Sequence, residues 1–459
     1  MTDDMKHPRK LLAFALFVLA APVAQAFDLI DAWQAALRYS ADYAAAQYGR
    51  DAEQEQEAQT RAGLLPQIAA SSSYARQPPS LSANTRSYGW NIQLSQPLYD
   101  KVRWEQFQQG KLATQIATQK LSSAEHELWQ KVAEAYFQVL LNRDKLASIE
   151  EEMRAYAQQI EQAQAMFEQG AATIVDTLEA QAGYEAARAK HTDIQAALQF
   201  AKISLHSLTG LDADKTAPIK RADLDDLLAH STLADWFALA ENHNPQWQMQ
   251  RLALESAQRG VRAARAERLP KLTLTGGYQD NHNTQNSLWG EQQYRSKGGS
   301  VSVQLTIPVF SAGLISSQIR QATAQQLQNE AVLEGVARQI RMSVEQAYQS
   351  TRDGEEQIRA QQQWLNASIV RLDATKQGRE FGVRSTLDEM QAQQAKAEAE
   401  QKLAEARYHY ILSYLFLLQH AGMLSLPEQQ WQLRAKLYET SPSAQPHSSG
   451  EKPPPPLPG

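Results

Sequence analysis

Apolar side chains recur every seven residues through a long proline-free stretch of the chain. Residues 98–217 and 309–426 contain no proline, so each stretch reads as long helix, turned once at a glycine. Between about residues 101 and 169 the first stretch carries two interleaved apolar series, the pattern of a coiled-coil seam over about five heptads. A helix of that length would extend about 100 Å, although an ordinary intramolecular helix pair would show the same seam. The series are Val132, Val139, Leu146, Met153, Ile160 and Phe167, and Leu128, Ala135, Asn142, Ile149, Tyr156 and Ala163.

Two other stretches alternate between apolar and uncharged polar residues. Tyr88, Trp90, Ile92 and Leu94 alternate with small polar residues, and residues 301–307 repeat the pattern. This predicts β-strands with one apolar face, which a soluble half-buried sheet would also show. The aromatic residues near the strand ends favour an outer-membrane barrel, whose strands are about ten residues long. These aromatic residues are Tyr74, Tyr99, Tyr278, Trp289, Tyr294 and Phe310.

The chain repeats its own sequence pattern once. Residues 61–66 and 265–270 share Arg-Ala-x-x-Leu-Pro, and residues 93–97 and 304–308 share Gln-Leu-x-x-Pro. A shorter phrase occurs at both predicted helix turns, where a glycine precedes an aspartate by six residues: Gly170 with Asp176, and Gly382 with Asp388. The order never changes, which indicates duplication of a unit of about 200 residues.

The repeat divides the chain into segments. We expect a first repeat at 27–212, a linker at 213–230 and a second repeat at 231–425. Each repeat would hold one amphipathic helix (about 28–63 and 232–267) that ends before a Leu-Pro pair, then two strands, then a long helix pair. Four strands cannot close a barrel, because the smallest outer-membrane barrels have eight. Several chains must therefore share one barrel.

The two ends of the chain differ from the repeats. Residues 1–26 hold basic residues, an apolar run and then Ala-Gln-Ala, which predicts a cleaved signal peptide. The alternative is a membrane anchor, but the apolar run is shorter than the roughly 20 residues that a span needs. Residues 426–459 include four consecutive prolines and are expected to be a disordered tail.

Composition excludes several classes of protein. The formal net charge of −6 and the 43% hydrophobic content give no case for binding nucleic acid. The absence of cysteine excludes disulfides, thiolate metal sites and lipidation of a cysteine after the signal peptide. No P-loop, HExxH or GxSxG motif occurs. We therefore expect no cofactor, no metal site and no enzymatic activity.

The combined pattern resembles the TolC family of outer-membrane efflux proteins. The marks are Leu-Leu-Pro-Gln at 64–67, Gln-Pro-Leu-Tyr-Asp at 96–100, Ala-Tyr-Phe-Gln-Val-Leu at 135–140 and the Gly-x5-Asp phrase at both turns. The resemblance implies a mainly α-helical fold with a small β part. Long antiparallel coiled-coil helices would form an α-barrel, and four strands per chain would join a twelve-stranded transmembrane β-barrel in a homotrimer.

The resemblance also assigns roles to residues at the two turns, which it places at the narrow periplasmic end. Asp388 matches the first position of a constricting aspartate ring, and Gln391 occupies the second, where the family has an acid. Arg384 matches a latch arginine and Asp176 the acid that it reaches. Arg379 stands where the family has a latch tyrosine. Gly170 and Gly382 would be the turn glycines. The alternative for the charged residues is ordinary solvated charge at helix ends.

The implied function is that of an outer-membrane exit duct with a large periplasmic part. It would conduct proteins or small toxic compounds passively, in a tripartite efflux or type I secretion system. Its partners would be a periplasmic adaptor, an inner-membrane transporter of the ABC or RND type, and outer-membrane lipid. A soluble periplasmic coiled-coil scaffold without a channel is the alternative, and it would be recovered without detergent.

Overall fold

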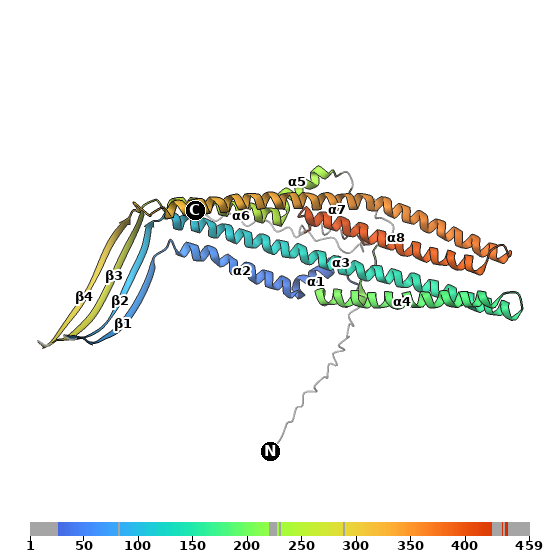
Figure 1. Ribbon diagram of the computed structural model, residues 1–459, viewed down its shortest axis with the longest axis horizontal. Helices are drawn as coiled ribbons and strands as arrows, with labels where there is room; N and C mark the ends of the chain where they lie inside the picture. The colour runs from blue at the N-terminus through green and yellow to red at the C-terminus, as the bar shows by residue number, and fades with distance from the viewer. Residues whose placement is uncertain are drawn as a thin grey trace, which may run out of the picture.

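The computed structural model is a long rod of helices with a β-sheet at one end (Figure 1). It describes residues 26–80, 83–219, 227–228, 231–287, 290–424, 434 and 437–438. The expected signal peptide (1–26) therefore lies almost wholly outside the described residues. So do Trp289, part of the linker and nearly all of the expected tail (426–459), and these predictions stay predictions.

The sheet has four strands, all antiparallel, in the order β1-β2-β3-β4. They are β1 (Gln67–Ser80), β2 (Ala83–Tyr99), β3 (Lys271–Ser287) and β4 (Gly290–Thr306). With 14 to 17 residues each, the strands are longer than the ten or so that the sequence suggested. The pairing of β2 with β3 joins the two repeats, with Ile92 opposite Tyr278. Within the described ranges, the outer edges of β1 and β4 have no strand partner.

The rod consists of two antiparallel pairs of long helices. One pair is α3 (Lys101–Glu168) with α4 (Ile174–Thr209), and the other is α7 (Leu314–Glu380) with α8 (Thr386–His420). α3 and α7 have 68 and 67 residues, which confirms the long helices and corresponds to about 100 Å. The coiled-coil seam is buried at Val132, Val139 and Ile149, whereas Phe167 at its far end is 44% exposed.

The single helix expected at the start of each repeat is wrong, because two helices stand there in both cases. They are α1 (Leu29–Tyr39) and α2 (Ala41–Ala62), and α5 (Leu233–His243) and α6 (Pro245–Ala266). Ser40 and Asn244 separate them with an extended backbone (ψ 120° and 121°), and each side chain accepts hydrogen bonds from the next helix. Such residues are preferred at helix N-termini, and Pro245 occupies the first helical turn, where proline is tolerated.

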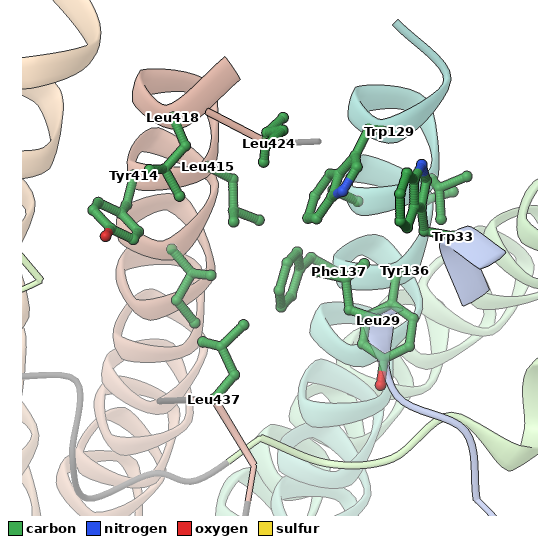
Figure 2. Close-up of a cluster of buried hydrophobic side chains, with 14 of the residues drawn as sticks. Leu29, Trp33, Trp129, Tyr136, Phe137, Tyr414, Leu415, Leu418, Leu424 and Leu437 are labelled. Carbon is green, nitrogen blue, oxygen red and sulfur yellow. The ribbon is translucent and has the colours of Figure 1, made fainter. Parts of the chain in front are cut away.

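The main hydrophobic core lies midway along the rod, where both repeats meet (Figure 2). Trp129, Tyr136 and Phe137 of α3 face Leu29 of α1 and Leu415 of α8, and all five are almost fully buried. Leu437 and Tyr438, which lie within the expected disordered tail, belong to the same core, so that expectation is wrong for them. Tyr438 accepts a hydrogen bond from the Leu29 amide at 3.2 Å, and Arg434 forms ion pairs with Asp28 and Asp31 at the start of α1.

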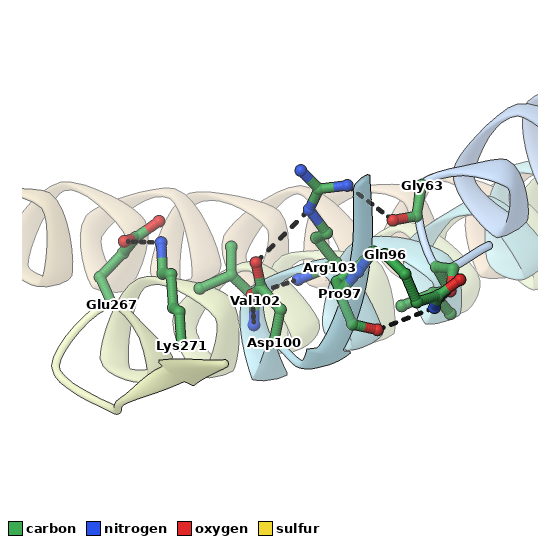
Figure 3. Close-up of polar contacts among 9 residues, drawn as sticks. Gly63, Gln96, Pro97, Asp100, Val102, Arg103, Glu267 and Lys271 are labelled. Carbon is green, nitrogen blue, oxygen red and sulfur yellow. Dashed lines mark hydrogen bonds and ion pairs between the residues drawn. The ribbon is translucent and has the colours of Figure 1, made fainter. Parts of the chain in front are cut away.

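Polar contacts join the sheet to the helices (Figure 3). Asp100 begins α3, and its carboxylate accepts hydrogen bonds from the amides of Val102 (3.0 Å) and Arg103 (3.2 Å). The Arg103 guanidinium donates to the carbonyl of Gly63 at 2.7 Å, and Lys271 pairs with Glu267 at 2.8 Å. These contacts fix the backbone where β2 leads into α3 and where α6 leads into β3.

Candidate functional site

The two faces of the sheet differ as the alternating pattern predicts. The pairs Ile68–Leu94, Ile92–Tyr278 and Leu274–Val303 place large apolar side chains on one face, while residues such as Gln93 and Gln304 occupy the other. Many of these apolar side chains are exposed, Val301 to 79%. A large exposed apolar surface marks contact with lipid or protein. The sheet can therefore face lipid on one side and water on the other.

At the opposite end of the rod, both turns have the same backbone geometry. Gly170 and Gly382 have φ values of +73° and +71°, a left-handed conformation that glycine adopts without strain. The amides that follow return to the preceding helix, Ala171 to the carbonyl of Met166 and Val383 to that of Gly378, each at 2.8 Å. This arrangement is a Schellman helix end. An added Cβ would meet nothing within 4 Å, so the backbone angle alone favours glycine.

The aspartate of each repeated phrase closes a capping box on the following helix. Asp176 accepts hydrogen bonds from the amide (2.9 Å) and hydroxyl (2.8 Å) of Thr173. Asp388 accepts the corresponding bonds from Ser385, both at 2.9 Å. Paired bonds of this kind satisfy amides at a helix start. The repeated phrase is therefore a signal to end one helix and begin the next, whatever else the acids do.

Asp388 keeps its negative charge in this position. Its pKa is lowered mainly by the hydrogen bond from the Ser385 amide, then by the Ser385 hydroxyl and by the nearby positive charge of Arg384. The Arg384 guanidinium lies 4.0 Å from the carboxylate, and the two side chains are 59% and 40% exposed. Gln391, one turn further along α8, is also exposed. The tip thus presents an ionised carboxylate and an amide to water.

The structure does not bring Arg384 and Asp176 together within one chain. The ion pair of Arg384 is with Asp388, and the Asp176 carboxylate bonds to Thr173. A contact between Arg384 of one chain and Asp176 of another stays a prediction.

Arg379 instead joins three helices at the tip. Its Nε lies 2.8 Å from a carboxylate oxygen of Glu389 on α8, and its guanidinium donates at 2.8 Å to the side chain of Gln162 on α3. The Glu389 side chain is only 5% exposed and that of Arg379 is 26% exposed. We call Arg379, Glu389 and Gln162 the tip cluster. It connects the α7–α8 pair to the α3–α4 pair.

Sequence reasoning missed two members of the tip cluster. The sequence pattern assigns no role to Glu389 or Gln162. The spacing along α8 is the available signal for Glu389. Ala392 and Gln393, which are buried, follow it by three and four residues. Positions with that spacing share one face of a helix, so the acid falls on the buried side of α8.

The part of the chain that the structure describes holds neither a membrane-spanning helix nor a metal-binding cluster. No described helix is both long enough and apolar enough to cross a membrane. No group of three or more His, Asp or Glu side chains among the described residues is placed to hold a metal ion.

Comparison with known proteins identifies the family of this chain. The sequence matches the outer membrane efflux protein family over residues 32–211 and 236–422. The chain belongs to that family. It is 29% identical over 451 residues to the proteases secretion protein PrtF of Dickeya chrysanthemi, covering 95% of this chain and 96% of PrtF. It is 28% identical to the alkaline protease secretion protein AprF of Pseudomonas aeruginosa (89% and 87%) and 28% identical to the outer membrane protein TolC of Vibrio cholerae (82% and 86%).

Solved structures share the fold. A membrane protein from Pseudomonas aeruginosa superposes with a TM-score of 0.74 at 22% identity, covering 86% of this chain and 90% of that one. The CmeC outer membrane channel of Campylobacter jejuni gives 0.71 at 15% identity, with 89% of each chain covered. The solved structures confirm the fold. The family match and the relatives confirm the family, the outer-membrane location and the role of an exit duct, and they exclude the soluble scaffold.

Proposed function

We propose that three copies of this chain assemble into one channel. The observation that carries the proposal is the sheet with two open edges, at β1 and β4, and one apolar face. A sheet edge exposes unpaired backbone groups, which cannot be satisfied in lipid. β4 of one copy would pair with β1 of the next, and three copies would give a closed barrel within the even-numbered range of outer-membrane barrels.

The proposed channel is the exit duct of a type I secretion system. PrtF and AprF, which match most of this chain, are both named as protease secretion proteins, and this supports an exported protein as the main substrate. Small toxic compounds are the second candidate, since TtgC of Pseudomonas putida, 25% identical, is named as a probable efflux pump protein. The duct would act with a periplasmic adaptor and an inner-membrane transporter of the ABC or RND type.

The proposed constriction is at the turns, far from the sheet. Three copies of Asp388 around one axis would form an anionic ring, with Gln391 as a neutral ring one turn further. Rings of acidic side chains favour cations. Arg384 would reach Asp176 of a neighbouring chain, and the tip cluster around Arg379 would hold the two helix pairs of one chain together. Release of these contacts would widen the opening.

The mass of the purified protein in mild detergent tests the assembly. We expect three times the mass of one mature chain before heating and the mass of one chain after heating. A monomer in mild detergent would contradict the shared barrel.

Deletion of the gene tests the substrate. We expect loss of one or more proteases from the culture medium with little change in drug sensitivity, and recovery of secretion when the intact gene returns. Unchanged secretion together with a raised drug sensitivity would assign the channel to efflux instead.

A further inference from the structure

Two arginines lie directly opposite each other on the outer part of the sheet. Arg76 of β1 pairs in register with Arg86 of β2, and both side chains are exposed. Like charges in directly opposite positions destabilise a sheet, because their Cβ atoms are only about 5 Å apart. Among the residues that the structure describes, no carboxylate forms an ion pair with either arginine. The pair therefore lacks a negative partner.

Aromatic side chains lie on the same strands, two residues closer to the helices. Tyr74 pairs with Tyr88, and the Tyr88 ring stacks on His282 of β3 at 4.7 Å between centroids. Both tyrosines lie on the same face as the arginines, since they are two residues away on each strand. Aromatic rows in outer-membrane barrels mark the level of the lipid headgroups. The arginine pair lies one step beyond that level, towards the strand ends that point away from the helices (Figure 1).

The other charged side chains on this face, among the described residues, lie on β3 and β4. Asp280 accepts a hydrogen bond from Arg295 at 2.7 Å and lies 3.4 Å from His282, and Lys297 is opposite it in register. Glu291, near the start of β4, accepts a hydrogen bond from Gln293. In contrast, Arg76 and Arg86 are the only charged residues of β1 and β2.

We propose that Arg76 and Arg86, with Tyr74 and Tyr88 beneath them, bind a phosphate group of an outer-leaflet glycolipid, as carried by lipopolysaccharide. Arginine binds phosphate through two parallel hydrogen bonds, so one phosphate between the guanidiniums would remove their repulsion. The tyrosine hydroxyls can donate to the same oxygens. The proposal rests on the proposed function, because the apolar face must lie in the outer membrane.

Binding of fluorescent lipopolysaccharide to the purified trimer in detergent micelles tests the site. The variant Arg76→Gln/Arg86→Gln should weaken binding by about 100-fold, about tenfold for each charged hydrogen-bonding partner. Arg76→Lys/Arg86→Lys keeps the charge but not the paired bonds, and should weaken it by about tenfold. The matched control is Arg338→Gln/Arg359→Gln, which removes two exposed charges on α7 and should bind as the original does. Dephosphorylated lipopolysaccharide should bind all forms weakly.

Each other outcome overturns the inference in a different way. Equal binding by the glutamine variant would remove the arginines from the site. If the glutamine variant does not assemble, equal binding by the lysine variant would refute the paired hydrogen bonds to phosphate. Equal binding of dephosphorylated lipopolysaccharide would remove the phosphate. Equal competition by phosphatidylglycerol vesicles would replace the glycolipid with a general anionic lipid. Absence of a trimer by mass would refute the proposed function, whereas a trimer that binds no lipopolysaccharide would refute this inference alone.

Discussion

Replacement of Arg379 by alanine should open the periplasmic end of the channel more than replacement of Arg384. The Arg379→Ala change removes the ion pair to Glu389 and the hydrogen bond to Gln162, both at 2.8 Å. The Glu389 carboxylate, 5% exposed, is then left without a positive partner. Since the tip cluster joins the two helix pairs, its loss favours their separation.

The Arg379–Glu389 ion pair is more buried than the Arg384–Asp388 pair, and this sets the expected difference in free energy between the two variants. Removal of one partner from a fully buried pair costs about 3–5 kcal/mol, and because Arg379 is 26% exposed, we expect about 2–3 kcal/mol for each chain. The Arg384–Asp388 pair is 4.0 Å apart and exposed on both sides, so it contributes about 0–1 kcal/mol. Since about 1.4 kcal/mol is a tenfold change, Arg379→Ala should shift the closed-to-open ratio by about 30- to 150-fold for each chain, and Arg384→Ala by about fivefold at most.

Single-channel conductance in planar lipid bilayers measures the opening. We expect the conductance of Arg379→Ala to exceed that of Arg384→Ala, which in turn is equal to or slightly above the original. Addition of Glu389→Gln to Arg379→Ala should bring conductance back towards the original value, because the buried charge is gone. If Arg379→Ala conducts as the original protein does while Arg384→Ala conducts more, the tip cluster does not hold the channel closed.

Three further predictions concern other parts of the molecule. Asp388→Asn should weaken cation selectivity and keep an acceptor for the Ser385 amide, whereas Asp388→Ala should also cost about 0.5–1.5 kcal/mol through loss of that hydrogen bond. Reversal potentials and thermal dissociation of the trimer separate the two variants, and unchanged selectivity in both would leave Asp388 with a capping role only. Ile92→Arg on the apolar face should destabilise the assembled barrel by about 2–4 kcal/mol near mid-bilayer, while Gln93→Arg on the other face should be tolerated. The yield of trimer measures the difference, and equal yields would mean that the lipid-facing side of the sheet is assigned wrongly. Burial, and then the charge of His420, lowers the pKa of His126 from 6.5 to about 4. Between these two pH values the side chain is neutral in the folded protein and protonated in the unfolded chain. The free energy of unfolding should therefore fall as pH drops from about 6.5 towards 4, by at most about 3 kcal/mol. The urea midpoint should depend less on pH in His126→Gln, and an identical pH dependence would contradict the lowered pKa of His126.

The long helices and the strands could be predicted because their signals are periodic and extended. The proline-free stretches and the apolar series from Leu128 to Phe167 indicate α3 over most of its length. In contrast, the break at Ser40 depends on one residue whose hydroxyl caps the next helix. A single serine within an amphipathic pattern does not outweigh the surrounding periodicity, although Asn244 followed by Pro245 is a readable helix start.

The tip residues could be located from the sequence, but only part of their chemistry could be read. The repeated phrase indicates both turns, and the spacing of Ser385 from Asp388 matches a capping box. The contact of Arg379 with Gln162 joins residues 217 positions apart. Only the relative placement of two helix pairs decides that contact, and no local pattern encodes it.

The C-terminal residues in the central core affect the order in which contacts can form during synthesis. Tyr438 bonds to Leu29 across 409 positions of the chain, and Arg434 reaches Asp31 across 403. The start of α1 therefore gains these two contacts only after the ribosome has made almost the whole protein. Contacts between such distant positions form slowly. A nascent chain thus lacks both contacts at the centre of the rod until synthesis is almost complete.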